Sequence, residues 1–176
     1  MGGRNATGPF SHRAFPGRRA IRFSTRRARR DHRVDTSDMY WAEDRVGPER
    51  IKGAYAWRTV LNSGARLALG SDFPVEDVNP FFGIYAAVTR QDQKGWPPGG
   101  WYPEQKLTLA EAIRGFTSDA AYAAFEENSR GTIEPGKLAD FTIVEGDLYS
   151  MPQSELFKAK VRYTVVGGEI VYRGVR

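Results

Sequence analysis

The stretch of sequence with the clearest chemical potential is RLALGSDFPVE, residues 66–76. A short apolar run ends at Gly70 and Ser71, and a single carboxylate, Asp72, follows before a Phe-Pro pair. An aspartate just past a strand commonly caps a helix or closes a turn. At the carboxyl end of a barrel strand it can instead ligate a metal ion, or carry a proton from metal-bound water to a leaving amine. The stretch alone leaves both interpretations open.

The composition excludes several kinds of site. The chain has no cysteine, so disulfides, thiolate metal sites and cysteine nucleophiles are all ruled out. Its two histidines, His12 and His32, form no His-x-His pair. No segment is apolar enough to span a membrane, and the N-terminus lacks the apolar core of a signal peptide. We therefore expect a cytoplasmic protein with no membrane partner.

The charge is concentrated at the N-terminus. Residues 1–33 hold ten Arg, no Lys and one acid, whereas residues 34–176 hold sixteen bases and twenty acids. With few large apolar side chains, residues 1–34 are expected to be disordered. They are either a basic arm that binds phosphates or an out-of-frame translation of GC-rich DNA. The absence of lysine and the small number of aromatic residues, Phe10, Phe15 and Phe23, make a nucleic acid the less expected partner.

The next part of the chain, residues 35–125, has the pattern of an α/β layer. Pro48 lies in the first turn of a helix that is expected to run past Leu61 and to close at Gly64. Residues 67–69 are expected to form a short buried strand. Asn79 is expected to cap a second helix, whose apolar stripe consists of Phe81, Ile84, Tyr85 and Val88.

A loop rich in Gly, Pro and Trp covers residues 91–103. Thr108 and Glu111 have the spacing of a capping box, and Ser118 is expected to cap a further helix that reaches Phe125. The order helix, buried strand, helix is typical of layers built on parallel strands.

Residues 126–176 have the pattern of β-structure. Gly136 is expected to supply the positive φ of a turn over residues 134–137. Residues 141–144 form a predicted strand. Two more, residues 161–166 and 169–173, flank Gly167 and Gly168, which is a strong signal for a two-residue hairpin.

Three segments together resemble the amidohydrolase superfamily, and within it the amidohydrolase-3 branch that includes N-substituted formamide deformylases. The first, SDMYWAEDRVGPERIKGAYAWRTVLNSGARLALGSDFPVEDVNPFFGIYAAVTRQ, resembles the end of the family's barrel and contains the Gly-Ser-Asp of residues 70–72. The second, LTLAEAIRGFTSDAAYAAFEENSRGTIEPGKLADFTIVEGD, resembles the family's passage from barrel to small β-domain. The third, VRYTVVGGEIVYRG, resembles its terminal hairpin. The likeness covers about residues 35–176.

The resemblance implies an α/β fold: the C-terminal fragment of a metal-dependent (β/α)8 barrel, followed by part of a small composite β-sandwich domain. Residues 35–125 would hold the last barrel strands and helices, and residues 126–176 the β-domain. Asp72 would match the family's catalytic and metal-binding aspartate, zinc would be the cofactor, and a small-molecule amide or formamide would be hydrolysed at its carbon–nitrogen bond. Trp96 and Trp101 would lie near the barrel mouth, where they could contact substrate.

The chain lacks most of what that activity requires. A zinc site needs three or four protein ligands, and neither His12 nor His32 matches a family motif. A complete barrel needs about 200 residues. We therefore expect a truncated chain that is inactive alone and self-associates through exposed barrel edges. A frameshift or misplaced start near Asp35 would explain the arginine excess and the missing strands together, and an intact upstream frame running into residue 1 would contradict it.

Two alternatives to the enzyme remain. A non-catalytic fragment could have kept the scaffold after the loss of catalysis. A nucleic-acid-binding protein could use the N-terminal Arg-rich arm, and would show salt-sensitive binding that is lost on deletion of residues 1–33.

Overall fold

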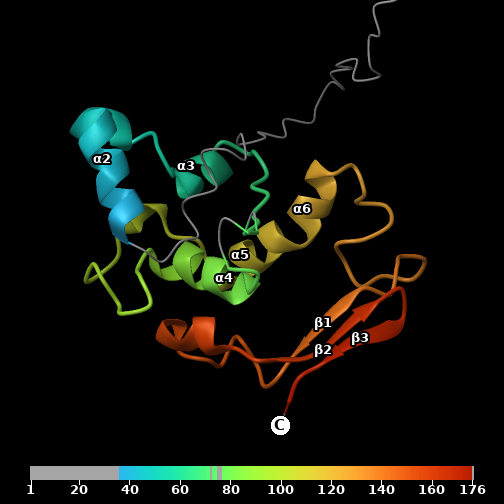
Figure 1. Ribbon diagram of the computed structural model, residues 1–176. Coiled ribbons are helices and arrows are strands. Elements are labelled where there is room, and N and C mark those ends of the chain that lie inside the picture. Colours follow the sequence, from blue (N-terminus) through green and yellow to red (C-terminus); the bar gives the residue numbers. More distant parts are fainter. Residues whose placement is uncertain (1–35, 72, 75–76, 176) are drawn as a thin grey trace, which may run out of the picture.

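The fold is described for residues 36–71, 73–74 and 77–175 of a computed structural model, with side chains from residue 42 onward. Helices make up the first two thirds of this part, and a three-stranded sheet lies to one side of them (Figure 1). The helices are α2 (Thr36–Ile51), α3 (Trp57–Asn62), α4 (Pro80–Thr89), α5 (Leu109–Phe116) and α6 (Ser118–Ala123). Two short 3-10 helices, η1 (Pro103–Gln105) and η2 (Gln153–Lys158), complete the helical part. No described helix combines the length and the apolar composition needed to cross a bilayer.

The core is built around α4, which is buried on nearly every side. Its N-cap is as predicted: Asn79 Oδ1 accepts a hydrogen bond from the Phe81 N–H (3.0 Å), and Pro80 opens the helix. Helices α3 and α5 and the 3-10 helix η2 contribute the other core side chains. In Figure 1, η2 lies directly below α4, which explains how Leu156 becomes fully buried. The α4 stripe predicted from the sequence is confirmed, but η2 was not anticipated.

The predicted helix from Pro48 to Leu61 is in fact two helices. The chain leaves α2 after Ile51 and re-enters a helix only at Trp57. Between them Tyr55 takes a positive φ of 55°, a conformation incompatible with a continuing helix. Helix α2 also begins earlier than expected, at Thr36, with a break at Gly47 (φ 76°) immediately before Pro48. The backbone therefore changes direction at Gly47 and again between α2 and α3, where helical periodicity alone predicted one continuous helix.

Two further predictions need correction. Residues 67–69 form no β-strand, although burial alternates along them, because no strand of the described residues runs alongside to complete a ladder. Ser118 is the first residue of α6 and not its cap. Thr117 occupies the cap position, but its hydroxyl donates back to the Ile113 carbonyl (2.8 Å) and does not cap α6. The helix ends at Ala123, before Phe125, whose φ of 63° is left-handed.

The C-terminal sheet matches the sequence prediction strand for strand. Strands β1 (Phe141–Val144), β2 (Val161–Val166) and β3 (Glu169–Arg173) pair antiparallel in the order β1-β2-β3. Gly167 (φ 59°) and Gly168 (φ 87°) make the predicted hairpin turn. Gly136 likewise supplies a positive φ of 89° in the turn over residues 134–137.

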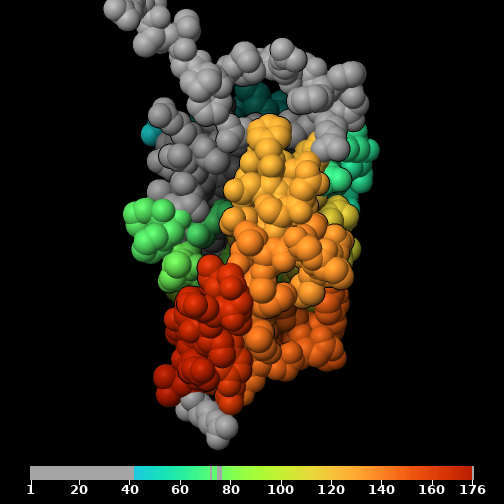
Figure 2. All heavy atoms as spheres, turned by 90° about the vertical axis from the view of Figure 1, so that its right-hand side faces the viewer, coloured from blue at the N-terminus to red at the C-terminus, as the bar shows by residue number. Residues whose placement is uncertain are grey.

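The sheet has one apolar face and one polar face. The register aligns Phe141 with Val165 and Ile170, and Ile143 with Tyr163, so these five side chains share a face, with Arg173 aligned to Tyr163 and its guanidinium over that ring. Thr142, Thr164 and Tyr172 are aligned on the other face. Only the end of the sheet at Val144 and Val161 touches the helical core. In Figure 2 the sheet lies at the lower end of the molecule, in colours from orange (β1) to red (β3). No described helix packs extensively against it.

Candidate functional site

Asp72, the carboxylate on which the sequence interpretation depends, lies outside the described residues. Its neighbours on both sides are described. The apolar stretch 65–69 precedes it, and the N-terminus of α4 follows it after Asp77 and Asn79. Phe73, immediately after it, is exposed. Asp72 therefore belongs to the connection between a core-packed segment and the helix at the centre of the core.

The stretch before Asp72 is fixed against α5. Leu67 is buried and Leu69 packs on the same cluster, whereas Arg66 before them and Ala68 between them are exposed. The Leu69 N–H donates to the Gly115 carbonyl (3.0 Å). Glycine is required there, since a Cβ on Gly115 would stand 2.8 Å from Leu69 Cδ1. Alternate side chains thus face the core, as they do on a strand.

The segment after Asp72 is ordered by its own carboxylate. Asp77 Oδ1 accepts the Asn79 N–H (2.8 Å), and Asn79 in turn caps α4. These side-chain bonds form a local turn of the kind that aspartate and asparagine favour. Asp77 therefore has a structural role beside the candidate site.

The described residues do not fit a zinc site. No group of three or more His, Cys, Asp or Glu side chains comes together within the part of the chain that the structure describes. Both histidines and Asp72 lie outside that part. We therefore derive no reaction step through a metal ion.

The two tryptophans proposed as substrate contacts lie in different environments. Trp96 is 50% exposed, on a loop that projects from the helices. Trp101 is only 6% exposed and packs edge-on against Tyr55 and Tyr102, with its Nε1 donating to Glu43 (3.3 Å). Of the two, Trp96 is the one whose ring can meet a ligand from solvent.

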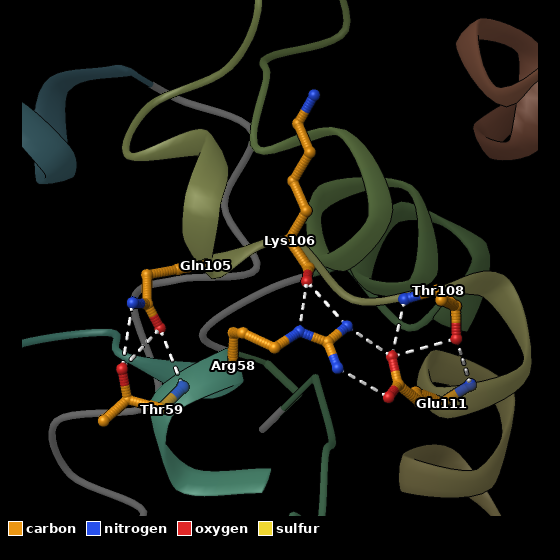
Figure 3. A network of polar contacts seen from close by, with 6 residues as sticks. All are labelled: Arg58, Thr59, Gln105, Lys106, Thr108 and Glu111. Atoms are coloured by element: carbon orange, nitrogen blue, oxygen red, sulfur yellow. Dashed lines mark hydrogen bonds and ion pairs between the residues drawn. The ribbon is translucent and has the colours of Figure 1, made fainter. Parts of the chain in front are cut away.

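A polar network joins α3 to the start of α5 (Figure 3). Arg58 donates from both terminal nitrogens to the two carboxylate oxygens of Glu111 (2.7 and 2.6 Å), and from Nε and Nη2 to the Lys106 carbonyl (3.2 and 3.0 Å). Glu111 also accepts the N–H of Thr108 (2.8 Å), which completes the predicted capping box. Beside it, the side chains of Gln105 and Thr59 exchange hydrogen bonds.

The network controls the ionisation of Glu111. The Arg58 guanidinium, together with the Thr108 donors, lowers the pKa of the Glu111 carboxyl from 4.5 to about 2 against the opposing effect of burial. The same hydrogen bond raises the pKa of Arg58. The charges of Arg58 and Glu111 neutralise each other, and both groups stay ionised near neutral pH. This Arg58–Glu111 clamp is therefore structural and offers no group for proton transfer.

The sequence predicted the Thr108–Glu111 capping box but not the pairing of Glu111 with Arg58. Thr108 and Glu111 are three residues apart, and their spacing was a sufficient signal. Arg58 is more than fifty residues away, and no local pattern marks it as a partner of Glu111. For the same reason, the sequence did not predict that Arg90, at the end of α4, would be buried.

Comparison with protein families shows a match over most of the chain. The sequence model of the family described as "Amidohydrolase family" matches residues 18–172. The match begins inside the Arg-rich segment, upstream of residue 35. The boundary that we placed at residue 34 remains a prediction.

Curated relatives show the same likeness. The chain is 38% identical over 136 residues to the putative amidohydrolase YtcJ of Bacillus subtilis, covering 77% of this chain and 26% of that protein. It is 38% identical over 143 residues to the protein LONG AFTER FAR-RED 3 of Arabidopsis thaliana (81% and 24%), and 31% identical over 115 residues to an N-substituted formamide deformylase of Arthrobacter pascens (65% and 21%). The chain thus spans about a quarter of the length of these relatives.

One solved structure, an amidohydrolase from Thermotoga maritima MSB8, superposes with a TM-score of 0.49 at 20% identity, covering 68% of this chain and 26% of that one. A superposition of that quality adds no support for a particular fold.

Proposed function

Because this chain belongs to the amidohydrolase family, we propose that it represents the end of the barrel and part of the small β-domain of a metal-dependent hydrolase of amide or formamide carbon–nitrogen bonds. The observation that carries the proposal is the family match, which runs through the whole described core. Residues 67–69 form no strand by themselves, but they turn alternate side chains to the core as a barrel strand with neighbours would, which is compatible with Asp72 at the end of such a strand. Carboxylates at the ends of barrel strands are the usual carriers of chemistry in such folds.

In this proposal Asp72 transfers a proton. Its carboxylate takes a proton from the attacking water as the new carbon–oxygen bond forms. It then delivers that proton to the nitrogen as the carbon–nitrogen bond breaks, so that the amine leaves neutral. Trp96 contacts the substrate beside the reacting bond. The family is typically metal-dependent, and zinc remains the proposed ion, with ligands from outside the described residues.

The open apolar face of the sheet supports the β-domain part of the proposal. Phe141, Tyr163 and Val165 are only half-buried, and Ile143 and Ile170 are exposed. An antiparallel sheet ordinarily packs its apolar face on another layer. A second sheet, from the part of the family fold that this chain does not span, would complete a sandwich.

A chimera tests the catalytic proposal. The segment of the Arthrobacter pascens N-substituted formamide deformylase that matches this chain would be replaced by this chain's residues, and release of formate from formanilide would be measured. We expect activity in the chimera, and a fall in kcat of about 10²–10⁴-fold with Asp72→Asn. The matched variant Asp77→Asn, which alters a turn carboxylate, should stay within a few-fold of the chimera. Equal activity of the Asp72→Asn and unmodified chimeras would refute the role of Asp72.

A second candidate is a scaffold without catalysis. The observation in its favour is that the chain spans only about a quarter of the length of its curated relatives. It predicts that the chimera folds, as judged by its circular dichroism, and releases no formate even with zinc in excess.

A further inference from the structure

Residues 91–100 form a loop that leaves the helical core after Arg90 and returns to it at Trp101. We refer to its closely spaced ends, residues 89–90 and 100–101, as the neck. At the neck the Trp101 N–H donates to the Arg90 carbonyl (2.9 Å), and Arg90 Nε donates back to the Trp101 carbonyl (3.0 Å). Gly100 lies so close to the end of α4 that a Cβ there would overlap the carbonyl oxygen of Thr89. Loops with closely apposed ends and internal packing are frequently functional.

Arg90 holds this neck together. It ends α4 in a left-handed conformation (φ 59°), and its side chain is only 2% exposed. The guanidinium lies over the rings of Trp57 (4.5 Å to the centroid) and Trp101 (5.0 Å). Its Nη1 also donates to the Tyr55 carbonyl (3.2 Å). A planar guanidinium can bond two carbonyls and contact two rings at once, which a lysine ammonium cannot do.

The interior of the loop is tied to the neck by hydrogen bonds. Asp92 Oδ1 accepts the N–H groups of Lys94 and Trp96 (both 2.8 Å), and the Asp92 N–H donates to the Trp96 carbonyl (2.7 Å). Gln91 Nε2 donates to the carbonyls of Gly95 (2.7 Å) and Pro97 (2.9 Å). The loop is therefore one bonded unit, and its orientation depends on the neck.

The loop is also tied to α4, since the Tyr85 hydroxyl donates to the Asp92 carbonyl (2.7 Å). Half of the Trp96 surface nevertheless remains exposed on this unit. An exposed aromatic ring held rigidly gives large contact area on binding at little conformational cost.

We propose that Arg90 is a positioning residue: by clamping the neck between Trp57 and Trp101 it fixes loop 91–100, and so holds the Trp96 ring ready for a flat apolar group of a ligand. Where that ligand is the substituent of an amide substrate, the inference rests on the proposed function. The clamp itself does not, because it can be measured without any reaction.

Hydrogen exchange of the purified chain tests the clamp. In Arg90→Met, which keeps the stem and removes the guanidinium, we expect the amides of Lys94, Trp96 and Gly100 to exchange at least tenfold faster than in the wild type. Amides of β2 should keep their rates. Arg90→Lys retains a cation at the rings but cannot bond both carbonyls, so partial rescue is expected.

Arg130→Met is the control, since it removes an exposed arginine that pairs only with nearby Glu126 and should leave the loop unchanged. If Arg90→Met folds and its loop amides exchange at the wild-type rate, the proposal is overturned. If Arg90→Met does not fold, Arg90→Lys serves in its place: unchanged loop exchange in that variant overturns it equally.

Formanilide binding separates the clamp from the proposed function. Binding at this ring is measured as quenching of the Trp96 fluorescence, which is the part of the wild-type signal that is absent from Trp96→Phe. We expect Arg90→Met to raise the Kd at least fivefold, and an unchanged Kd counts against positioning of the ring. If the wild type does not bind formanilide while loop exchange responds as expected, the clamp is upheld and the substrate contact of Trp96 is rejected.

Discussion

At the scale of single residues, Glu111 is the carboxylate held most firmly in its ionised form among the residues that the structure describes. It accepts two bonds from Arg58 and also caps α5, so one carboxylate fixes two helices that are distant in the sequence. Neither partner is fully buried, with side-chain exposures of 28% for Arg58 and 22% for Glu111. Solvent weakens the ion pair at that exposure, and the bidentate geometry strengthens it.

Replacing Glu111 with glutamine should destabilise the chain. Glu111→Gln keeps the size of the side chain but removes its charge, and we expect the free energy of unfolding to fall by about 1–3 kcal/mol at pH 7. Urea denaturation measures this. The control, Glu155→Gln, removes an exposed pair with Lys158 and should cost less than about 0.5 kcal/mol. Equal effects of the two variants would show that the clamp contributes nothing special.

The same residue predicts acid sensitivity. The pKa of Glu111 is about 2 in the folded chain and ordinarily 4.5, so folding favours its ionised form. Its contribution is complete above pH 4.5 and is lost as the pH falls towards 2. The difference in unfolding free energy between wild type and Glu111→Gln should therefore shrink across that range. A difference that stays constant from pH 6 to pH 2.5 would contradict the assignment.

At the scale of elements, the approach of α5 to the stretch before Asp72 depends on a single glycine. Gly115→Ala would place a methyl group 2.8 Å from Leu69 Cδ1 and 3.1 Å from the Leu67 carbonyl oxygen. We expect a loss of about 1–3 kcal/mol, measured by urea denaturation. Gly70→Ala is the matched control, since nothing lies within 4 Å of its Cβ, and it should change stability by less than about 0.5 kcal/mol. If Gly115→Ala leaves the free energy of unfolding unchanged, residues 67–69 move away from α5 without loss of stability, which would contradict this expectation.

The elements that sequence predicted well are those whose signals are local. The Asn79 cap, the Thr108–Glu111 box and the two-glycine hairpin each depend on residues within a few positions of one another, and all are present. The break between α2 and α3 was missed because helical periodicity continues through Tyr55, where the backbone turns away. A strand at residues 67–69 was predicted from apolarity, but a strand also needs a neighbour, which periodicity cannot supply.

The candidate site was less predictable than the fold. Local sequence marked Asp72, and the family resemblance pointed to Trp96 and Trp101. Neither marked the neck that orients the Trp96 loop, since Arg90, Trp57 and Tyr55 come from three separate segments. A buried arginine also runs against the usual distribution of that residue. Long-range contacts of this kind have no signature in a single sequence.

At the scale of the whole molecule, the described chain has two open surfaces: the apolar face of its sheet and the outer side of residues 66–70. Face-to-face contact between copies would cover the sheet. We expect the purified chain to self-associate in sedimentation velocity experiments, and Ile143→Lys, on the apolar face of the edge strand β1, to reduce it. Thr142→Lys, on the opposite face of the same strand, is the control. A monomeric wild type at high micromolar concentration would refute this expectation.

We propose that this chain carries the last part of an amidohydrolase barrel and that ligands from outside the described residues complete the reaction centre. The zinc content of the purified chain after equilibration with the metal, measured together with formanilide hydrolysis, tests this directly. We expect well below one equivalent of tightly bound zinc and no release of formate. One equivalent of zinc that is lost in Asp72→Asn, together with turnover by the chain alone, would contradict it.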